Sequence, residues 1–541
     1  MSKKESFIKG TLILAAAALV ARVLGLAQRV PLEHLFNDIG NASFTQANTV
    51  YLMLLPLATA GIPSTLSKMV SERYALNRPH EAQQIYRAAL IFAAIVGVLM
   101  STILYIGAPY YAAYAKVPES TLAIRAIAPA LLLFPAIAMM RGYFQGRNNM
   151  MAGGISQIVE QIARVSTAIL LAYILLRQGY DNTWMAAGAS FGSVFGSVGA
   201  FAIMLYYAAR MRRTEEKAAL YDSSAARLPL LGIYKDIFKL SIPIVLSSVT
   251  VPVVNFIDTS LIVPLLSGQL GIEEATRALG IFGSRAQSVA GIPPVLSIAL
   301  STSLIPIISA AFARKDEQHL KRQVTLALRI SILTGTPIVL ALVAASYSVN
   351  GLLFSSLDGS GIIAMLTFGA IFQITMMTTN SILLGMGKSR ISMYYVFAGI
   401  LVKLAGSLLF SRIFGIYGII GATALCFLVI TYLNLRMLKS IVSFEIMGRR
   451  WSGFAVAVLA SGGIGYGLNE AGIILTRLMP DRLAFLITCL VVGAAVVVIY
   501  LVLLIVLGVI TRQEIAGYPR ALQKLLNPLM KLQPARVRTH E

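Results

Sequence analysis

Charged side chains are scarce in this chain. They make up 13% of its 541 residues, whereas hydrophobic residues make up 57% and the mean hydropathy is +0.77. A soluble domain carries about 25% charged and about 45 to 50% apolar residues, so this composition excludes a soluble protein. Apolar runs of about 20 residues, long enough for a helix to cross the ~30 Å hydrocarbon core, recur along nearly the whole chain. They predict an all-α integral membrane protein, because a β-barrel would show short alternating segments instead.

Cysteine and histidine are also rare, with two and four copies. Cys426 and Cys489 lie in apolar segments, so we expect packing residues and no disulfide. The sequence has no Cys/His cluster at metal-ligand spacing, no P-loop lysine motif and no nucleophile elbow. We therefore expect no cofactor, no metal centre and a transporter rather than an enzyme.

Fourteen apolar segments are long enough to be transmembrane helices. The first follows the charged start MSKKESFIKG, which resembles a signal peptide but has no convincing cleavage site, so we predict a retained helix. The expected helices lie near residues 8–30, 42–69, 83–112, 121–146, 152–177, 183–209, 241–267, 277–312, 321–355, 360–386, 391–413, 416–440, 452–477 and 483–511.

Basic residues fall mainly on one set of alternate loops. With the N-terminus inside, 32 Lys and Arg residues are cytoplasmic and seven are outside. This positive-inside bias predicts cytoplasmic N- and C-termini in a plasma membrane. Most of the net charge of +22 is then membrane-surface charge, so we expect no nucleic-acid partner.

The two halves of the chain resemble each other. Gly61-Ile62-Pro63 recurs as Gly291-Ile292-Pro293, NRPHEAQQIYR (77–87) has a counterpart in ARKDEQHLKRQ (313–323), and YFQGRNN (143–149) in LLGMGKS (383–389). Offsets of about 230 to 240 residues, kept in order, predict two pseudo-symmetric six-helix lobes plus helices 13 and 14. The expected divisions are an N-terminal lobe at 1–209, a cytoplasmic linker with an amphipathic segment at 210–240, a C-terminal lobe at 241–440, helices 13 and 14 at 441–511, and a cytoplasmic amphipathic tail at 512–541.

Helix breakers occupy matched positions in the two repeats. Gly61 and Pro63 interrupt the second helix of the first lobe, and Gly291, Pro293 and Pro294 interrupt the second helix of the other. Proline removes a backbone hydrogen bond and glycine lets the chain bend, so these sites are candidate gating hinges. Static kinks that only improve packing are the alternative.

Inside the predicted helices, basic residues outnumber acidic ones. A charge at mid-bilayer costs about 2.5 to 3.5 kcal/mol on insertion scales, so such residues face a cavity or a partner. The acids are chiefly Glu160 and Asp258. The basic residues are Arg22, Arg29, Arg164, Arg285, Arg329 and Lys403.

Three arginines are candidates for binding an anionic substrate in a cavity. Arg22 and Arg29 are seven residues apart, so they project from nearly the same helix face. Arg285 lies well inside its helix, just before the second helix break. Snorkelling to the outer headgroups is the alternative for Arg29, and pairing with Asp258 is the alternative for Arg285.

The remaining charges suggest ion pairs. Glu160 and Arg164 are spaced i, i+4 in the favourable order, which favours a structural ion pair, with a ligand role as the alternative. Asp258 and Lys403 fall in the same predicted lobe, so they form either an internal ion pair or part of a coupling site. In the second case Asp258 and Asn255 would bind a cation.

Three stretches carry a family resemblance: ARVLGLAQR (21–29), TAGIPSTLSKMVSERY (59–74) and RGYFQGRNNM (141–150). With fourteen helices in two lobes, they resemble the MurJ and stage V sporulation protein B branch of the multidrug/oligosaccharidyl-lipid/polysaccharide (MOP) flippase superfamily. The resemblance covers about residues 5–511 and is weakest in helices 13 and 14.

That resemblance implies a lipid II flippase of the bacterial plasma membrane that works by alternating access, with helices 13 and 14 forming a groove for the undecaprenyl tail. It implies that arginines hold the anionic substrate; Arg22 and Arg29 match those of helix 1, and Arg285 matches that of helix 8. The arginines of helix 2 have no counterpart here. Some relatives bind sodium through an aspartate that Asp258 resembles, whereas Lys403 departs from that pattern and can replace the ion.

Other functions stay open at this point. The chain could flip another undecaprenyl-linked polysaccharide unit, export drugs with a coupled cation, or act as a membrane scaffold for cell-wall enzymes. The positive interior argues against drug export. The expected partners are an undecaprenyl-pyrophosphate-linked glycan, membrane lipids and cell-wall synthesis proteins. We expect a monomer, with coupling to the membrane potential, Na⁺ or H⁺.

Overall fold

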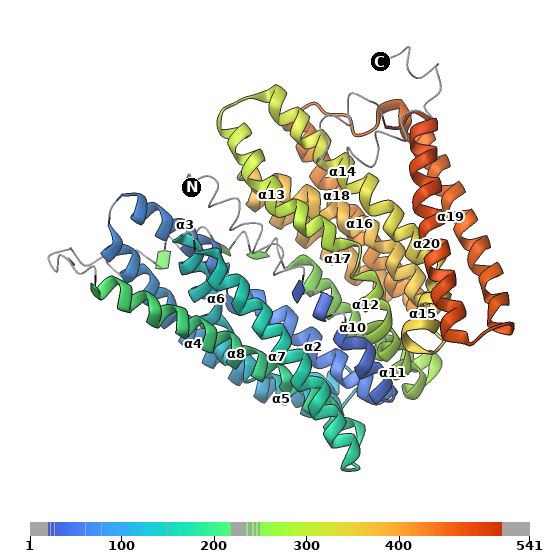
Figure 1. Cartoon of the computed structure of the whole chain (residues 1–541), viewed down its shortest axis with the longest axis horizontal. Helices are drawn as coiled ribbons and strands as arrows, with labels where there is room; N and C mark the ends of the chain where they lie inside the picture. Colours follow the sequence, from blue (N-terminus) through green and yellow to red (C-terminus); the bar gives the residue numbers. More distant parts are fainter. Residues whose placement is uncertain are drawn as a thin grey trace. The chain divides into compact units, whose positions relative to one another are not determined.

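The structure, a computed structural model, describes residues 20–510 except 22, 26, 60, 77, 148, 218–233, 236–240, 243–244 and 247–248. Every regular element within these residues is a helix (Figure 1), which confirms the predicted all-α fold class. Contacts divide the chain into two units. Unit 1 runs to Ser284 and includes Ser411–Ile416, and unit 2 comprises Arg285–Phe410 and the chain from Tyr417 onwards.

Unit 1 has its first described helical segment at residues 20–21, 23–25 and 27–35. Its further helices are α2 (Asp38–Thr59), α3 (Ile62–Ala75), α4 (Pro79–Tyr114), α5 (Ser120–Ile127), α6 (Ala130–Gly146), α7 (Met150–Arg177), α8 (Asn182–Lys217), α10 (Thr250–Leu270) and α11 (Ile272–Gly280). The π-helical turn η1 (Ile281–Ala286) crosses into unit 2. The boundary between the units therefore lies inside the eighth predicted helix, whereas the lobes predicted from the duplication meet near residue 241.

Unit 2 holds the remaining helices of the described chain. Its helices are α12 (Gln287–Ala290), α13 (Pro294–Ala313), α14 (Glu317–Ala344), α15 (Ser346–Phe354), α16 (Ser360–Gly385), α17 (Ser389–Phe414), α18 (Ile416–Ile441), η2 (Gly448–Arg450), α19 (Trp451–Ile473), η3 (Ile474–Arg477) and α20 (Asp481–Val506).

Twelve helical stretches among the described residues are long and apolar enough to cross a membrane. Two of the fourteen predicted spans are not among them. The first, at 8–30, lies mostly outside the described residues. The eighth, at 277–312, is divided by η1 and by a turn at Gly291 into shorter pieces that include α12 and α13. Hydropathy averaged over a window therefore predicts one helix, whereas the structure has several.

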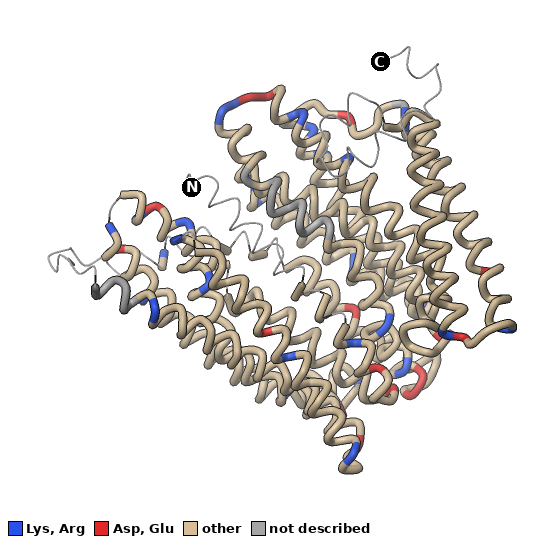
Figure 2. The backbone as a smooth tube through the Cα atoms, in the orientation of Figure 1, with Lys and Arg blue, Asp and Glu red and all other residues tan. Residues whose placement is uncertain are grey.

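Within each unit the charged residues gather toward the helix ends and are sparse along the helices (Figure 2). Short turns join these ends. Pro79 occupies the first turn of α4, where its missing N–H has no intrahelical acceptor to lose. Asp316 caps α14 by accepting a 3.0 Å hydrogen bond from the backbone N–H of His319. Such local signals place the ends of the spans where polar sequence begins.

Helix breaks occur at both predicted hinge positions. In unit 1, α2 ends at Thr59 and α3 begins at Ile62, and Gly61 between them has a φ of 62°. A side chain would be strained in that left-handed conformation. At the second position, α12 ends at Ala290 and α13 begins at Pro294, with Gly291 and Pro293 between them. The breaks are present, and their role as gating hinges stays a prediction.

Two glycines let α6 pack directly on the backbone of α3. A Cβ at Gly142 would lie 2.5 Å from the Pro63 carbonyl oxygen, and one at Gly146 would lie 2.6 Å from that of Ser67. The four-residue spacing is the Gly-xxx-Gly pattern, which brings membrane helices close where hydrophobic burial drives little association. This contact places the helix break before Pro63 close to α6.

We expect Gly142→Val to lower the Tm of the purified protein, because overpacking a tight contact costs about 1 to 3 kcal/mol. Gly107→Val is the matched control, since a Cβ at Gly107 on α4 would meet no atom within 4 Å. Thermal unfolding in detergent measures both variants. Equal melting temperatures would show that the α3–α6 contact tolerates a side chain.

Candidate functional site

Arg29 is the described member of the predicted arginine pair in the first helical segment. Its Nη1 donates a hydrogen bond to the backbone carbonyl of Gly283 in η1. A Cβ at Gly283 would lie 2.0 Å from Thr45 Cγ2, so η1 is pressed against α2 at this point. Arg22, the other member, lies outside the described residues. Arg29 is therefore tied to protein backbone, rather than being an isolated charge at the surface.

A buried hydrogen-bond network joins α2, α4 and α10 in unit 1. Gln46 on α2 donates from Nε2 to the Thr259 carbonyl at 2.9 Å and accepts a 2.5 Å hydrogen bond from the Tyr111 hydroxyl. The Tyr111 hydroxyl is also 2.9 Å from Ser260 Oγ, and its ring stacks on Phe256. We call Gln46, Tyr111 and Ser260 the outer polar contact, since the predicted topology puts it in the outer half of the membrane.

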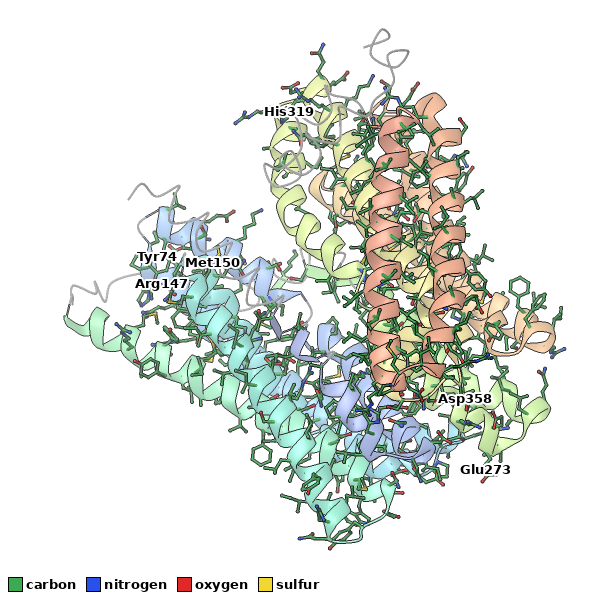
Figure 3. All side chains as sticks on the ribbon, turned by 45° about the vertical axis from the view of Figure 1, so that its right-hand side comes forward. Tyr74, Arg147, Met150, Glu273, His319 and Asp358 are labelled. Atoms are coloured by element: carbon green, nitrogen blue, oxygen red, sulfur yellow. The ribbon has the colours of Figure 1, made fainter. Side chains whose placement is uncertain are left out.

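The same side of unit 1 carries an exposed ion pair. Arg277 Nε is 3.9 Å from Asp38 Oδ2, with both side chains 40% or more exposed. Exposed pairs contribute about 0 to 1 kcal/mol, so the buried network is the stronger connection between α2 and the helices α10 and α11. In Figure 3, Glu273 of α11 lies at one end of unit 1 and Tyr74, Arg147 and Met150 lie at the other.

Glu160 is paired with a different arginine from the one the spacing predicts. Arg141 Nη2 on α6 is 2.8 Å from Glu160 Oε2, and the two side chains are only 15% and 13% exposed. Arg164 instead donates to Gln161 Oε1 at 2.6 Å. The predicted Glu160–Arg164 pair is therefore wrong. Arg141 reaches Glu160 on α7 from the neighbouring helix α6.

Arg285 contacts the loop between α15 and α16. Its Nη1 donates to the Asp358 backbone carbonyl at 3.3 Å, and Asn350 Nδ2 donates to the same oxygen at 2.9 Å. Figure 3 places Asp358 at one end of unit 2 and His319 at the opposite end. Arg29 and Arg285 thus belong to different units and contact different backbone carbonyls. Their joint role in one cavity stays a prediction.

Asp258 and Lys403 are both fully buried in transmembrane helices. Lys403 Nζ on α17 donates to the Ile419 carbonyl on α18 at 2.8 Å, and Thr423 Oγ1 is 3.4 Å from the same oxygen. Asp258 lies on α10 in unit 1, where half-buried Asn255 accepts a hydrogen bond at its backbone oxygen from Thr259. Among the described residues no three His, Cys, Asp or Glu side chains group as metal ligands. The Asp258–Lys403 pair and the Asp258–Asn255 cation site both stay predictions.

Unit 2 also contains a buried amide cluster that sequence reasoning missed. Asn434 Nδ2 on α18 donates to Asn380 Oδ1 at 2.7 Å and to Thr379 Oγ1 at 3.1 Å, and Ser392 Oγ donates to Asn380 Oδ1 at 3.1 Å. The signal in the sequence is the polar run Thr378–Ser381 within an otherwise apolar helix. Arg329 on α14 is likewise buried, and its Nη2 donates to the Val509 carbonyl just beyond α20 at 2.8 Å.

The motif RGYFQGRNN forms an aromatic cluster at one end of unit 1 (Figure 3). The Arg147 guanidinium lies 4.9 Å from the Tyr74 ring and 5.7 Å from the Tyr143 ring, and it also contacts Met211 Sδ. Tyr143 in turn stacks on Tyr86 at 4.1 Å. This cation–π arrangement joins the ends of α3, α4, α6 and α8. The motif therefore contributes to holding the unit together.

The sequence also matches a known family. The family described as "Polysaccharide biosynthesis protein" matches residues 7–312, which is more than half of the chain. The chain belongs to this family. The uncharacterized membrane protein YabM of Bacillus subtilis (strain 168) is 28% identical over 437 residues, covering 81% of each chain. Lipid II flippase MurJ of the same strain is 24% identical over 476 residues, covering 85% of each.

Solved structures show the same fold. Lipid II flippase MurJ in an inward closed conformation gives a TM-score of 0.65 at 13% identity and covers 91% of this chain and 98% of that one. An inward-facing MATE family multidrug resistance transporter of the MOP superfamily gives 0.64 at 15% identity and covers 78% and 95%. The predicted resemblance to MurJ is therefore supported by a related sequence and by a shared fold, and the apolar helices and the family make the chain a multi-pass membrane protein.

We expect Tyr111→Phe to lower the Tm, because it leaves the buried Gln46 Oε1 without its hydroxyl donor. An unsatisfied buried polar group costs about 1 to 3 kcal/mol. Tyr110→Phe, which makes the same chemical change at a neighbouring side chain that is 76% exposed, is the control. Thermal unfolding of the purified variants measures the difference, and an unchanged Tm for Tyr111→Phe would mean that the outer polar contact contributes nothing.

Proposed function

We propose that the chain is a flippase that carries lipid II, the undecaprenyl-pyrophosphate-linked peptidoglycan precursor, from the inner to the outer leaflet. The observation that carries the proposal is the positive charge inside the transmembrane helices of a polysaccharide biosynthesis family member. The basic residues inside the described helices outnumber the acidic ones, which are Glu33, Glu160 and Asp258. The basic residues are Arg29, Arg141, Arg164, Arg285, Arg329 and Lys403. A drug exporter for cations would need the opposite charge.

Guanidinium groups suit a diphosphate substrate for two physical reasons. Arginine keeps its charge at every physiological pH, and its planar fork matches two phosphate oxygens at once. A pyrophosphate that passes the membrane centre needs such counter-charge because hydrocarbon offers none. In this proposal Arg22, Arg29 and Arg285 bind the headgroup in a hydrated cavity.

The undecaprenyl chain stays in lipid while its headgroup crosses. We assign the tail groove to α19 and α20, which pack on each other closely enough that a Cβ at Gly465 would lie 2.4 Å from Val496 Cγ2. Large apolar side chains on these helices, such as Leu459 and Leu490, are 75% and 65% exposed. Alternating access then uses the breaks at Gly61/Pro63 and Gly291/Pro293/Pro294 as hinges, with both termini cytoplasmic and the protein acting as a monomer.

Flipping of another undecaprenyl-linked polysaccharide unit is the second candidate, because its pyrophosphate handle would be identical. The family description favours neither glycan. Cation-coupled drug export is disfavoured by the basic interior. A scaffold for cell-wall enzymes would leave the intramembrane arginines and the matched helix breaks without a purpose.

Expression in a bacterial strain depleted of its lipid II flippase tests the proposal. We expect the wild-type chain to restore growth and Arg22→Ala combined with Arg285→Ala to abolish it, because the pyrophosphate loses two charged ligands. Arg177→Ala, at an exposed outer helix end, should restore growth like the wild type. Full rescue by the double variant contradicts the arginine mechanism, and no rescue by the wild type favours another glycan.

Coupling makes a separate prediction. Lys403 is fully buried and its Nζ donates to the Ile419 carbonyl, so its ammonium is a fixed cation inside the helices of unit 2. We expect flipping in proteoliposomes, at a fixed membrane potential, to be unchanged when sodium is replaced by choline. A strong sodium requirement would show that Lys403 does not replace an ion.

A further inference from the structure

Arg164 lies at the middle of a transmembrane helix without an acidic partner among the described residues. It is 14 residues after Met150 and 13 before Arg177, the ends of α7, which puts it about 20 Å from each end. Its Nη2 donates to Gln161 Oε1 at 2.6 Å. Its Nε is buried and has no hydrogen-bond partner in the part of the chain that the structure describes. A guanidinium in this position is costly unless it binds something.

The nearby carboxylate is already neutralised by another arginine. Arg141 Nη2 is 2.8 Å from Glu160 Oε2 and 2.8 Å from Ser156 Oγ, and Arg141 Nε is 3.2 Å from the same hydroxyl. These contacts hold the Arg141 guanidinium against the Glu160 carboxylate and the Ser156 hydroxyl of α7. The cluster of Arg141, Glu160 and Arg164 therefore carries two positive charges and one negative charge. The excess charge is that of Arg164.

Arg164 faces the inside of unit 1. Residues 162 and 164 differ by 200° around a helix, and Ile162 is 51% exposed, so Arg164 points away from that outer face. Tyr51 of α2, only 4% exposed, is close enough to interact electrostatically with Glu160, Arg164 and Arg141. On the same inner face, Gln157 Oε1 is buried without a partner among the described residues.

The first helical segment lies against this cluster through Gly25. A Cβ at Gly25 would be 3.3 Å from Arg164 Nη2 and 3.7 Å from Gln161 Oε1. Gly25 and Arg29 are one i, i+4 step apart and so share a helix face. The uncompensated guanidinium is therefore beside the face that carries Arg29.

We propose that Arg164 is a further anion-binding residue of this protein, which receives a phosphate group at the face shared by Gly25 and Arg29. The ligand class is a diphosphate or phosphate monoester, either as a lipid headgroup or as a free anion. Arg141 is a positioning residue, since it holds Glu160 away from Arg164. The inference rests on the proposed function only in naming the lipid-linked substrate as the source of the phosphate.

Binding to the purified full-length protein in nanodiscs tests the site. One arm adds soluble inorganic pyrophosphate, and the other incorporates undecaprenyl pyrophosphate in the bilayer; each is scored by its shift in Tm over a concentration series at constant ionic strength. We expect Arg164→Gln to weaken binding at least about tenfold, the loss of roughly one charge-assisted hydrogen bond. Arg164→Lys should keep part of the affinity. Arg177→Gln, at the exposed end of the same helix, should bind like the wild type.

A second set of variants separates binding from a structural role. Arg141→Gln frees Glu160 to pair with Arg164 at i, i+4 and should weaken binding like Arg164→Gln. Adding Glu160→Gln should restore it, because the competing carboxylate is gone. A structural role predicts no such restoration.

The outcomes divide clearly. If Arg164→Gln loses the ligand-induced Tm shift only with undecaprenyl pyrophosphate, the site binds a lipid headgroup. If it loses the Tm shift only with inorganic pyrophosphate, the site binds a free anion. The proposal is overturned if neither ligand shifts the Tm of the wild type, or if folded Arg164→Gln binds with the wild-type affinity. It is also overturned if adding Glu160→Gln does not restore binding to Arg141→Gln. The result is independent of growth rescue, so a wild type that binds pyrophosphate through Arg164 but restores no growth contradicts only the lipid II assignment.

Discussion

The cost of charge in hydrocarbon governs where this protein places its basic residues. Each long cation in a transmembrane helix needs oxygen acceptors that lipid cannot supply. Arg29, Lys403 and Arg329 obtain them from the backbone carbonyls of Gly283, Ile419 and Val509. Each of these carbonyls belongs to a different segment, so satisfying the cation also joins two helices. A backbone carbonyl is neutral, so it accepts the hydrogen bond of a cation without cancelling the formal charge of that cation. The membrane-spanning part of the protein can therefore stay positively charged.

One of those carbonyls lies in irregular backbone. In a regular helix each carbonyl is engaged by the N–H four residues later, whereas a π-helical turn shifts that pattern. Gly283 lies in η1, and its missing side chain lets Thr45 of α2 come to where a Cβ would be. The same glycine thus permits the close packing of η1 on α2. A side chain there would push η1 away from α2.

Hydropathy predicts much of this fold because membrane spans are long and their composition is extreme. It failed to show that the span at 277–312 is divided, since Gly, Pro and π-turn geometry leave average hydropathy unchanged. The partners of the charged residues were harder to predict from the sequence than the helices. Glu160 has an arginine four residues later on its own helix, but Arg141 from α6 binds it instead. Sequence spacing reports neighbours along one helix, whereas the choice between two cations depends on which helices pack together and at what depth.

The pairing of Glu160 with Arg141 has a consequence for transport. A site that carries anions across a membrane has to bind them strongly enough to collect them and weakly enough to release them, the balance that also governs ion conduction. Arg141 and Arg164 without Glu160 would hold a phosphate between two full charges in a medium of low dielectric, where each interaction is strong. Glu160 removes one of these charges and leaves the other at the centre of α7. An acidic residue among the arginines is thus compatible with an anion carrier, because it limits the affinity that would otherwise trap the substrate.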